Sequence, residues 1–393
     1  MADIERILQR LEAIEAEVRE LKQVLRDLDQ PTESSAITAA SDAATKLELY
    51  LSRFAGRRDV YAQAWESRST GKKGWSPAVR GGFFDRQKLT HDFLPLTDDV
   101  LYRHLQGGGS PIGLYVTMPG DQCQLLACDF DGHSWREDAA AYAEACREQG
   151  LDPLCEISRS GDGAHVWLFF EAPVPAASAR SAGFSILRSA MRMRPTMDLE
   201  SYDRFFPAQD TLSTRSTGAA RLGNLIALPL HGDHRRRNRM VFADPATWEP
   251  LPDQFAALAA VTPTPQELLE SISARVPTFG PDPDLPRRPA KQARKPPSGV
   301  TVVLTVDNAV HIPTAGLPSD LVSELKHRSA IPNPEFYRRQ AQRMSTFGVP
   351  RLVIRFEHDD NEIRLPRGLL DEALTLLDHW GLGTKVQRRH PSL

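Results

Sequence analysis

The 393-residue sequence lacks the features that mark membrane, secreted and strongly basic proteins. No run of apolar residues approaches the ~18 that a membrane span needs, and the charged start, Met1 to Arg6, has no apolar signal-peptide core. The 48 Lys and Arg against 51 Asp and Glu give a net charge of −3. Bulk positive charge therefore cannot drive nucleic-acid binding, although a local basic groove can. We expect a soluble cytoplasmic protein without a membrane partner.

Cysteine is also scarce. The four cysteines, Cys123, Cys128, Cys146 and Cys155, contain no C-x-x-C pair. This argues against a zinc knuckle and against a disulfide framework. We expect reduced and mostly buried thiols.

The clearest periodic pattern covers the first 28 residues, where apolar positions alternate spacings of three and four. These positions are Ile4, Ile7, Leu11, Ile14, Val18, Leu21, Leu25 and Leu28. The heptad pattern predicts a coiled-coil helix over residues 1–29, about 42 Å long, through which copies of the chain associate. The alternative is one amphipathic helix docked on its own domain. Dimer, trimer and tetramer are all compatible with the pattern.

Composition divides the rest of the chain. Ser, Thr, Ala and Asp dominate residues 30–45, which predicts a linker. Residues 276–298 hold seven prolines and five basic residues, which predicts an extended, solvated spacer. The predicted folded units are therefore 46–275 and 299–393.

Within 46–275, one stretch predicts its own order of elements. Two apolar, β-prone runs, Ile112–Met118 and Cys123–Phe130, flank residues 119–121, whose Pro-Gly-Asp sequence favours a hairpin turn. A helix over Glu137–Gln149, strands over Leu154–Arg159 and Ala164–Phe170, and a helix over Ala176–Arg194 follow. The order β-β-α-β-β-α predicts an α+β fold, with a mixed sheet and helices on one face.

Two carboxylates end the second of these strands. Asp129 and Asp131 flank Phe130, so the period of two places both acids on one face of the strand. Because two carboxylates that point together repel each other, a hard divalent cation is their usual partner. In the simpler interpretation, one acid caps the following helix and the other is solvated. The spacing does not fit a calcium-binding EF-hand loop.

A glycine-rich turn, Ser160-Gly161-Asp162-Gly163-Ala164-His165, separates the next two strands. Its glycines allow a tight turn in which backbone N–H groups face an anion. If the outgoing strand pairs with the strand of Asp129, His165 can donate a hydrogen bond to a phosphate beside the metal. Otherwise His165 is a structural histidine in a hairpin.

A third acid and a basic turn extend this set. Asp203 and Asp210 follow the second helix and are the candidates for a further metal ligand. Residues 221–230 read as a buried strand entered by polar groups, and the basic run His234–Arg239 comes after it. We expect this basic run to contact a triphosphate or a duplex beside the glycine-rich turn.

Four motifs occur together: LACDFDG (126–132), SRSGDGAHVWLFF (158–170), SYDRFFPAQD (201–210) and GNLIALPL (223–230). In order and spacing they resemble the archaeo-eukaryotic primase superfamily and, within it, the primase-polymerases of TOTE conflict systems and their CRISPR-associated relatives. FAGRRDVYAQAWES (54–67) and FLPLTDDVLYRHL (93–105) resemble the same branch. The resemblance covers residues 51–260 and implies an α+β catalytic core with an RRM-like β-β-α-β-β-α unit.

The resemblance implies a role for each motif. Asp129 and Asp131 match its first metal-binding motif, and Asp203 matches the third metal-binding acid, in a register that the following Phe-Pro-x-Gln favours over Asp210. These three acids are the expected catalytic residues and would bind two divalent ions, Mg²⁺ or Mn²⁺. The expected nucleotide-binding residues are Arg159, Ser160, Gly163, His165 and Asn224.

The implied activity is template-directed nucleotidyl transfer, in which a 3′-hydroxyl attacks an α-phosphate and pyrophosphate leaves. The expected partners are a single-stranded DNA template, a primer, and dNTPs or NTPs. Residues 315–351 and 365–368 resemble the segment that leads into a superfamily 2 helicase in such proteins. Because the sequence has no G-x-x-x-x-G-K-[ST] loop, we expect the helicase as a separate or downstream partner. Many relatives carry a C-x-x-C pair between the positions of Trp65 and Phe93, and its absence here argues against a zinc site in this region.

Three other interpretations use the same residues. A haloacid-dehalogenase-like phosphatase also needs a strand-terminal D-x-D-G, but it expects Thr or Val where His133 stands and a Rossmann-like alternation of strands and helices. A metal-dependent nuclease would use the acids but has little need of the glycine–histidine hairpin. A non-catalytic coiled-coil scaffold that binds nucleic acid would tolerate loss of an acid, whereas the whole set is present.

Overall fold

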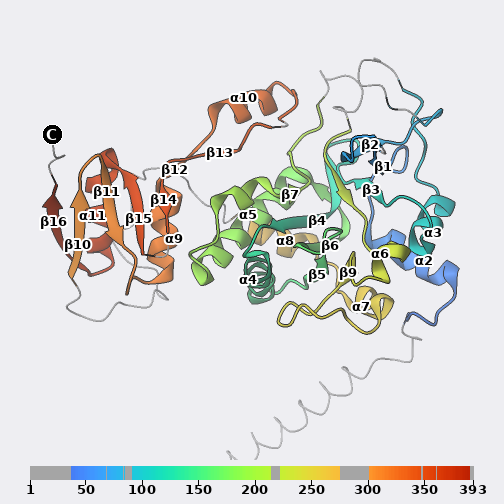
Figure 1. Ribbon diagram of the computed structural model, residues 1–393, viewed down its shortest axis with the longest axis horizontal. Coiled ribbons are helices and arrows are strands. Elements are labelled where there is room, and N and C mark those ends of the chain that lie inside the picture. The colour runs from blue at the N-terminus through green and yellow to red at the C-terminus, as the bar shows by residue number, and fades with distance from the viewer. Residues whose placement is uncertain are drawn as a thin grey trace, which may run out of the picture.

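The computed structural model describes residues 37–67, 69–82, 84, 91–213, 222–274, 301–346, 348–359 and 361–389, without the side chains of Tyr202 and Asp203. The predicted coiled coil and the proline-rich segment 276–298 lie outside the described residues. Within these ranges no helix is long and apolar enough to cross a bilayer. The chain forms a large unit (residues 37–274) and a C-terminal unit (residues 301–389) (Figure 1). One apolar cluster lies mainly in the large unit and another in the C-terminal unit.

Two antiparallel sheets build the large unit. The first has the strand order β2-β1-β3-β8 and the second the order β7-β4-β6-β5-β9. The strands of the first sheet are β1 (Ala62–Glu66), β2 (Lys73–Pro77), β3 (Ile112–Tyr115) and β8 (Leu225–Ala227). Those of the second are β4 (Gln122–Asp131), β5 (Leu154–Ile157), β6 (Gly163–Pro175), β7 (Phe205–Phe206) and β9 (Val241–Phe242).

The predicted order of elements is confirmed as β3-β4-α4-β5-β6-α5, with α4 at Trp135–Glu148 and α5 at Ala176–Met193. The sequence predicts a mixed sheet, but the second sheet is antiparallel. The crossover through α4 makes β4 and β5 run the same way, and β6 inserts between them as the antiparallel neighbour of both. The other helical segments among the described residues of the large unit are α2 (Ala43–Arg53), α3 (Asp98–Gln106), η1 (Leu199–Asp203), α6 (Gly232–Arg235), α7 (Gln254–Ala260) and α8 (Gln266–Ser273).

The turn between β3 and β4 corrects a second expectation. The chain does turn tightly there, and the Met118 N–H donates to the Gln122 carbonyl at 2.7 Å. The two strands nevertheless separate into different sheets, because β3 pairs with β1 and β8 while β4 pairs with β6 and β7. The hairpin therefore joins the two sheets instead of forming one of them.

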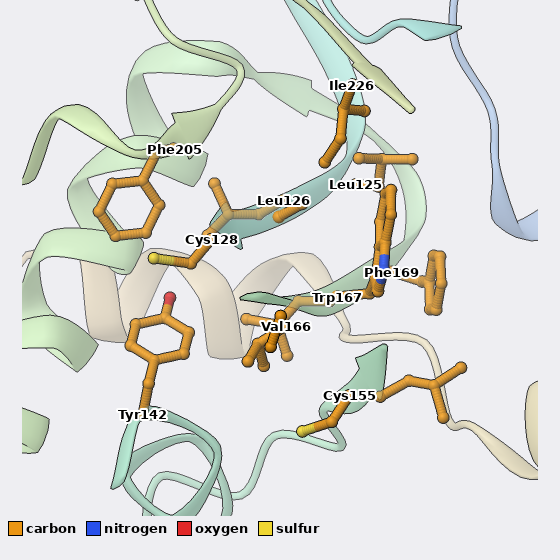
Figure 2. Close-up of a cluster of buried hydrophobic side chains, with 14 of the residues drawn as sticks. Leu125, Leu126, Cys128, Tyr142, Cys155, Val166, Trp167, Phe169, Phe205 and Ile226 are labelled. Carbon is orange, nitrogen blue, oxygen red and sulfur yellow. The ribbon is translucent and has the colours of Figure 1, made fainter. Parts of the chain in front are cut away.

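Strand β4 is packed on both faces. On one face Cys128 lies beside Tyr142 of α4 and Phe205 of β7, and on the other Leu125 lies with Trp167, Phe169 and Ile226 (Figure 2). Alternation of side chains along the strand produces this division. All four cysteines of the chain are free and buried, as the sequence predicts.

The C-terminal unit contains a five-stranded sheet of order β14-β15-β11-β10-β16. Its elements are β10 (Thr301–Val306), β11 (Ala309–Pro313), α9 (Ser319–Arg328), β14 (Glu357–His358), β15 (Glu362–Pro366), η3 (Arg367–Leu369), α11 (Leu370–His379) and β16 (Gly383–Arg388). Leu321 and Leu325 of α9 and Leu376 of α11 close its apolar cluster over the sheet.

Between α9 and β14 the chain leaves this sheet as a C-terminal arm, residues 330–354. The arm consists of β12 (Ala330–Pro332), α10 (Pro334–Ala341) and β13 (Leu352–Ile354), and its two strands pair antiparallel. Helix α9 packs against α5, and the buried Lys326 Nζ of α9 donates to the carbonyls of Pro195 and Met197. The two units therefore share an extended contact.

Candidate active site

The two strand-terminal acids lie at one edge of the second sheet. In the pairing of β4 with β6, Asp129 is opposite His165 and Asp131 is opposite Gly163. Phe130 points to the other face, where it is buried and its ring centroid lies 5.5 Å from that of Tyr142. Both acids thus share a face, and the strand of His165 is the neighbour of theirs. The histidine Nε2 is 3.7 Å from Oδ1 of Asp129.

A buried glutamate, Glu156 of β5, completes this row of side chains. It is opposite His165 in the sheet and fully buried. Its Oε2 accepts hydrogen bonds from His165 Nδ1 at 2.9 Å and from Trp167 Nε1 at 2.8 Å. Burial alone would lower the pKa of His165, but the carboxylates of Glu156 and Asp129 outweigh it and raise the pKa to about 9. Glu156 therefore fixes both the orientation and the charge of His165.

Sequence reasoning missed Glu156, although a signal was present. A charged residue inside the apolar run Leu154–Ile157 must have a partner if the strand is buried. The alternation of side chains along β5 could not identify that partner, because the pairing of β5 with β6 depends on the turn between the two strands.

Arg204 lies between the two acids. Its Nη1 donates to Asp131 Oδ2 at 2.7 Å and is 3.8 Å from Asp129 Oδ2. Burial raises the pKa of Asp129, and the charge of Asp131 adds to this, whereas His165 and Arg204 oppose it. The two carboxylates therefore converge on a cation, although the sequence had not marked Arg204 as a site residue.

The glycine-rich turn approaches the acids closely. A Cβ atom on Gly163 would lie 2.8 Å from Asp131 Oδ1 and 2.9 Å from the Phe130 carbonyl, so only glycine fits there without displacement. The Ser158 N–H donates to the Gly163 carbonyl at 2.8 Å, and Ser160 Oγ accepts from the Asp162 N–H at 3.1 Å. The turn is thus held by its own hydrogen bonds.

Arg159 and the basic run flank this turn. The Arg159 guanidinium lies 5.2 Å from the centroid of the Trp75 ring, which belongs to the first sheet. On the other side, the Met240 N–H donates to the Ile157 carbonyl at 2.8 Å, and a Cβ atom on Gly161 would lie 3.0 Å from Arg239 Nε. Arg236, Arg237 and Arg239 are exposed. The expected position of the basic run beside the glycine-rich turn is confirmed.

The segment with the third motif runs along the other side of β4. Strand β7 pairs with β4, and the Asp129 N–H donates to the Arg204 carbonyl at 2.9 Å. The backbone of Asp203, at the end of η1, is therefore next to the acids, while its side chain lies outside the described residues. Asp210 instead pairs with the buried Arg180, with Oδ1 2.8 Å from Nε.

Asn224 is placed apart from these residues. It precedes β8 of the first sheet and is half-buried. Within the described part of the chain, no hydrogen bond joins its side chain to the other candidate residues.

The residues at this edge fit a divalent metal ion. Two carboxylates that already share one cationic partner, Arg204, offer the oxygen ligands that hard cations prefer. Among the described residues no group of three His, Cys, Asp or Glu side chains is arranged to hold a metal. A third oxygen ligand would have to come from Asp203, whose backbone is nearby, or from substrate and water.

Comparison with known proteins identifies the family of the chain. Residues 45–272 match the family described as the archaeo-eukaryotic primase domain of TOTE conflict systems, which is more than half of the 393 residues. The chain belongs to this family. It is a member of the archaeo-eukaryotic primase superfamily, as the four motifs indicate. No curated protein matches the chain.

Two solved structures are similar to parts of the chain. One is the AEP domain of the primase-polymerase of cyanophage S-2L, at 14% identity, a TM-score of 0.27, and coverage of 60% of this chain and 98% of that one. The other is the polymerase domain of ligase D from Mycobacterium tuberculosis in complex with DNA, at 13% identity, a TM-score of 0.30, and coverage of 60% and 93%. Because both TM-scores are below 0.5, neither structure bears on the chemistry of this chain.

Proposed function

We propose that the chain is a DNA primase-polymerase, a nucleotidyltransferase that extends or begins a strand on a single-stranded DNA template. The observation that carries this proposal is the pairing of β4 with β6, which brings Asp129, Asp131, Gly163 and His165 to one edge of the sheet. Membership of the archaeo-eukaryotic primase family supports it. The antiparallel sheet argues against the haloacid-dehalogenase-like phosphatase, whose sheet is parallel and Rossmann-like.

Asp129, Asp131 and Asp203 would hold the divalent ions, Mg²⁺ or Mn²⁺. Such ions, when bound, lower the pKa of the attacking 3′-hydroxyl and neutralise charge on the leaving pyrophosphate. The protein's own residues bind and orient the nucleotide. His165, held by Glu156, donates a hydrogen bond to the triphosphate, as does the backbone of the glycine-rich turn.

The remaining nucleic-acid contacts follow from charge. Arg159 and the exposed arginines of the run His234–Arg239 would bind phosphates of the nucleotide, the primer or the template. Asn224 would contact the nucleotide only from the first sheet, which makes it the weakest member of the proposed set. The substrates are dNTPs or NTPs.

On the sequence alone we propose further properties. Residues 1–29 form a coiled coil that makes the protein a homo-oligomer, 46–275 form the catalytic domain, and 299–393 an accessory domain. A superfamily 2 helicase is the proposed partner, in a system of defence or conflict between genetic elements.

Nucleotide incorporation on single-stranded DNA tests the proposal. Wild-type protein is compared with the Asp129→Asn/Asp131→Asn variant, with and without a primer, in Mg²⁺ and in Mn²⁺. The control, Asp98→Asn/Asp99→Asn, removes the same charge from two exposed positions at the start of α3. We expect template-dependent products from the wild type and the control but not from the site variant. Folded wild-type protein that incorporates nothing, or that only degrades the template, would contradict the proposal.

A further inference from the structure

The C-terminal arm (residues 330–354) lies outside the 45–272 family match but packs against the large unit. In Figure 1 it lies between the C-terminal sheet and β7. Ala330 and Leu352 of the arm, 0% and 5% exposed, belong to the apolar cluster of the large unit. Such burial makes the arm part of the fold of the large unit.

Arg351 makes the central polar contact of the arm. The residue is 4% exposed, and its guanidinium lies 4.6 Å from the ring centroids of both Phe184 of α5 and Phe336 of α10. Nη1 donates to the Tyr337 hydroxyl at 3.3 Å, and Nη2 is 3.5 Å from Asp210 Oδ1. A guanidinium removed from water is stabilised by such stacking and by a carboxylate partner.

Asp210 connects the arm to α5. Besides Arg351, it pairs with Arg180 of α5 at 2.8 Å and accepts from Gln340 Nε2 of α10 at 2.7 Å. Arg180 Nη1 also donates to the Pro207 carbonyl at 2.6 Å. Residues 207–210 are therefore held from both sides, by α5 and by the arm.

A second set of hydrogen bonds continues along the same segment. Thr346 Oγ1 donates to Gln209 Oε1 at 3.3 Å, and Ser213 Oγ donates to the Arg343 carbonyl at 2.8 Å. Arg343 Nη2 donates to Asp121 in the turn before β4 at 2.9 Å. The arm therefore contacts the segment after the third motif and also the start of the strand that carries the acids.

The segment 207–210 directly follows β7. Phe205 of β7 pairs with Cys128, and the Asp129 N–H bonds to the Arg204 carbonyl. Strand β7 has only two residues, so it is too short to stop a shift of residues 207–210 from displacing the backbone of Arg204 and Asp203.

We propose that Arg351 is a positioning residue of the polymerase site and that the C-terminal arm completes that site. This inference rests on the proposed function. Arg351, Gln340 and Arg180 fix Asp210, and Asp210 fixes the segment that places Asp203 and Arg204 beside Asp129. Asp210 is then an anchor and not a metal ligand.

The test uses Arg351→Met in the full chain. Methionine keeps an apolar stem, and Asp210 keeps its pair with the buried Arg180, so the variant leaves neither charge without a partner. We expect kcat to fall about tenfold or more, because a misplaced acid affects the chemical step. The KM for the nucleotide should stay within about twofold, since His165 is held by β5 and β6. Amide hydrogen exchange should rise in residues 199–206 of the substrate-free protein.

The matched control is Arg338→Met, an exposed arginine of α10 that pairs with Glu335. This control should match the wild type in its kinetic constants and in its amide hydrogen exchange. If Arg351→Met does not fold, Gln340→Leu removes another contact to Asp210 and should give the same pattern, several-fold smaller. A folded Arg351→Met with wild-type kcat and unchanged exchange in 199–206 would overturn the inference. If the wild type incorporates nothing, the proposed function fails, and the local change in exchange alone decides whether Arg351 positions the segment.

Discussion

Gly163→Ala should damage the site through one added methyl group. The new Cβ would lie 2.8 Å from Asp131 Oδ1, 2.9 Å from the Phe130 carbonyl and 3.2 Å from Ser158 Oγ, where ordinary contacts begin at 3.4 Å. The shortfall to the carboxylate is 3.4 − 2.8 = 0.6 Å. The Phe130 carbonyl belongs to the backbone of β4 and cannot rotate away, so the strands or the Asp131 side chain must move.

The expected magnitudes differ for stability and for activity. Overpacking of this kind costs about 1–3 kcal/mol of the free energy of unfolding. A displacement approaching 1 Å at a reacting centre can cost about 100-fold in rate, so we expect kcat to fall about 10- to 100-fold. Single-turnover primer extension and urea denaturation measure the two effects on the same protein. Gly109→Ala is the control, because its Cβ would meet nothing within 4 Å. A Gly163→Ala protein with wild-type kcat and stability would refute this account of the turn.

Two further predictions concern buried titratable groups. Glu156→Leu removes the hydrogen-bond acceptor of His165 and Trp167 and should weaken triphosphate binding about tenfold or more in a nucleotide titration. Glu156→Gln can still accept both hydrogen bonds and should lose less affinity. Equal affinities in the wild type and both variants would contradict this. Burial lowers the pKa of His104 and of His327 to about 3. As the pH falls, the two histidines are protonated in the unfolded chain at about pH 6.5 but stay neutral in the folded protein until about pH 3. Their contribution to the free energy of unfolding is therefore complete above about pH 6.5 and is lost as the pH falls. Urea denaturation between about pH 6 and pH 4 should show a slope of up to about 1.4 kcal/mol per pH unit for each histidine, and His327→Gln should reduce it.

The sequence predicts the local part of this fold well. The order of strands and helices follows from hydrophobic period and turn residues, and the shared face of Asp129 and Asp131 follows from the period of two. The sequence does not predict that β4 pairs with β6, so the position of His165 beside Asp129 could be predicted only on the condition that these strands are neighbours. Once the structure supplies that pairing, the position of His165 follows from the register.

Non-local pairing explains what the sequence did not predict. The residues around Pro119 correctly indicate a turn, but the membership of β3 and β4 in different sheets depends on β1, β8, β6 and β7. Arg204 is one of many arginines, and only the pairing of β7 with β4 places it between the acids. The bond from Gln340 to Asp210 joins residues 130 positions apart, a separation at which no periodic pattern carries information.

The arm also bears on how such a chain can be divided. The proline-rich segment 276–298 is the obvious place to cut, yet α9 beyond it packs against α5, and Ala330 and Leu352 of the arm belong to the apolar cluster of the large unit. A protein that ended before this segment would expose that surface to water and leave Arg180 and Asp210 with fewer neighbours. The five-stranded sheet, in contrast, has an apolar cluster of its own. The stable large unit therefore extends past the boundary that composition suggests, and a shortened protein must retain residues 330–354 to keep that surface covered.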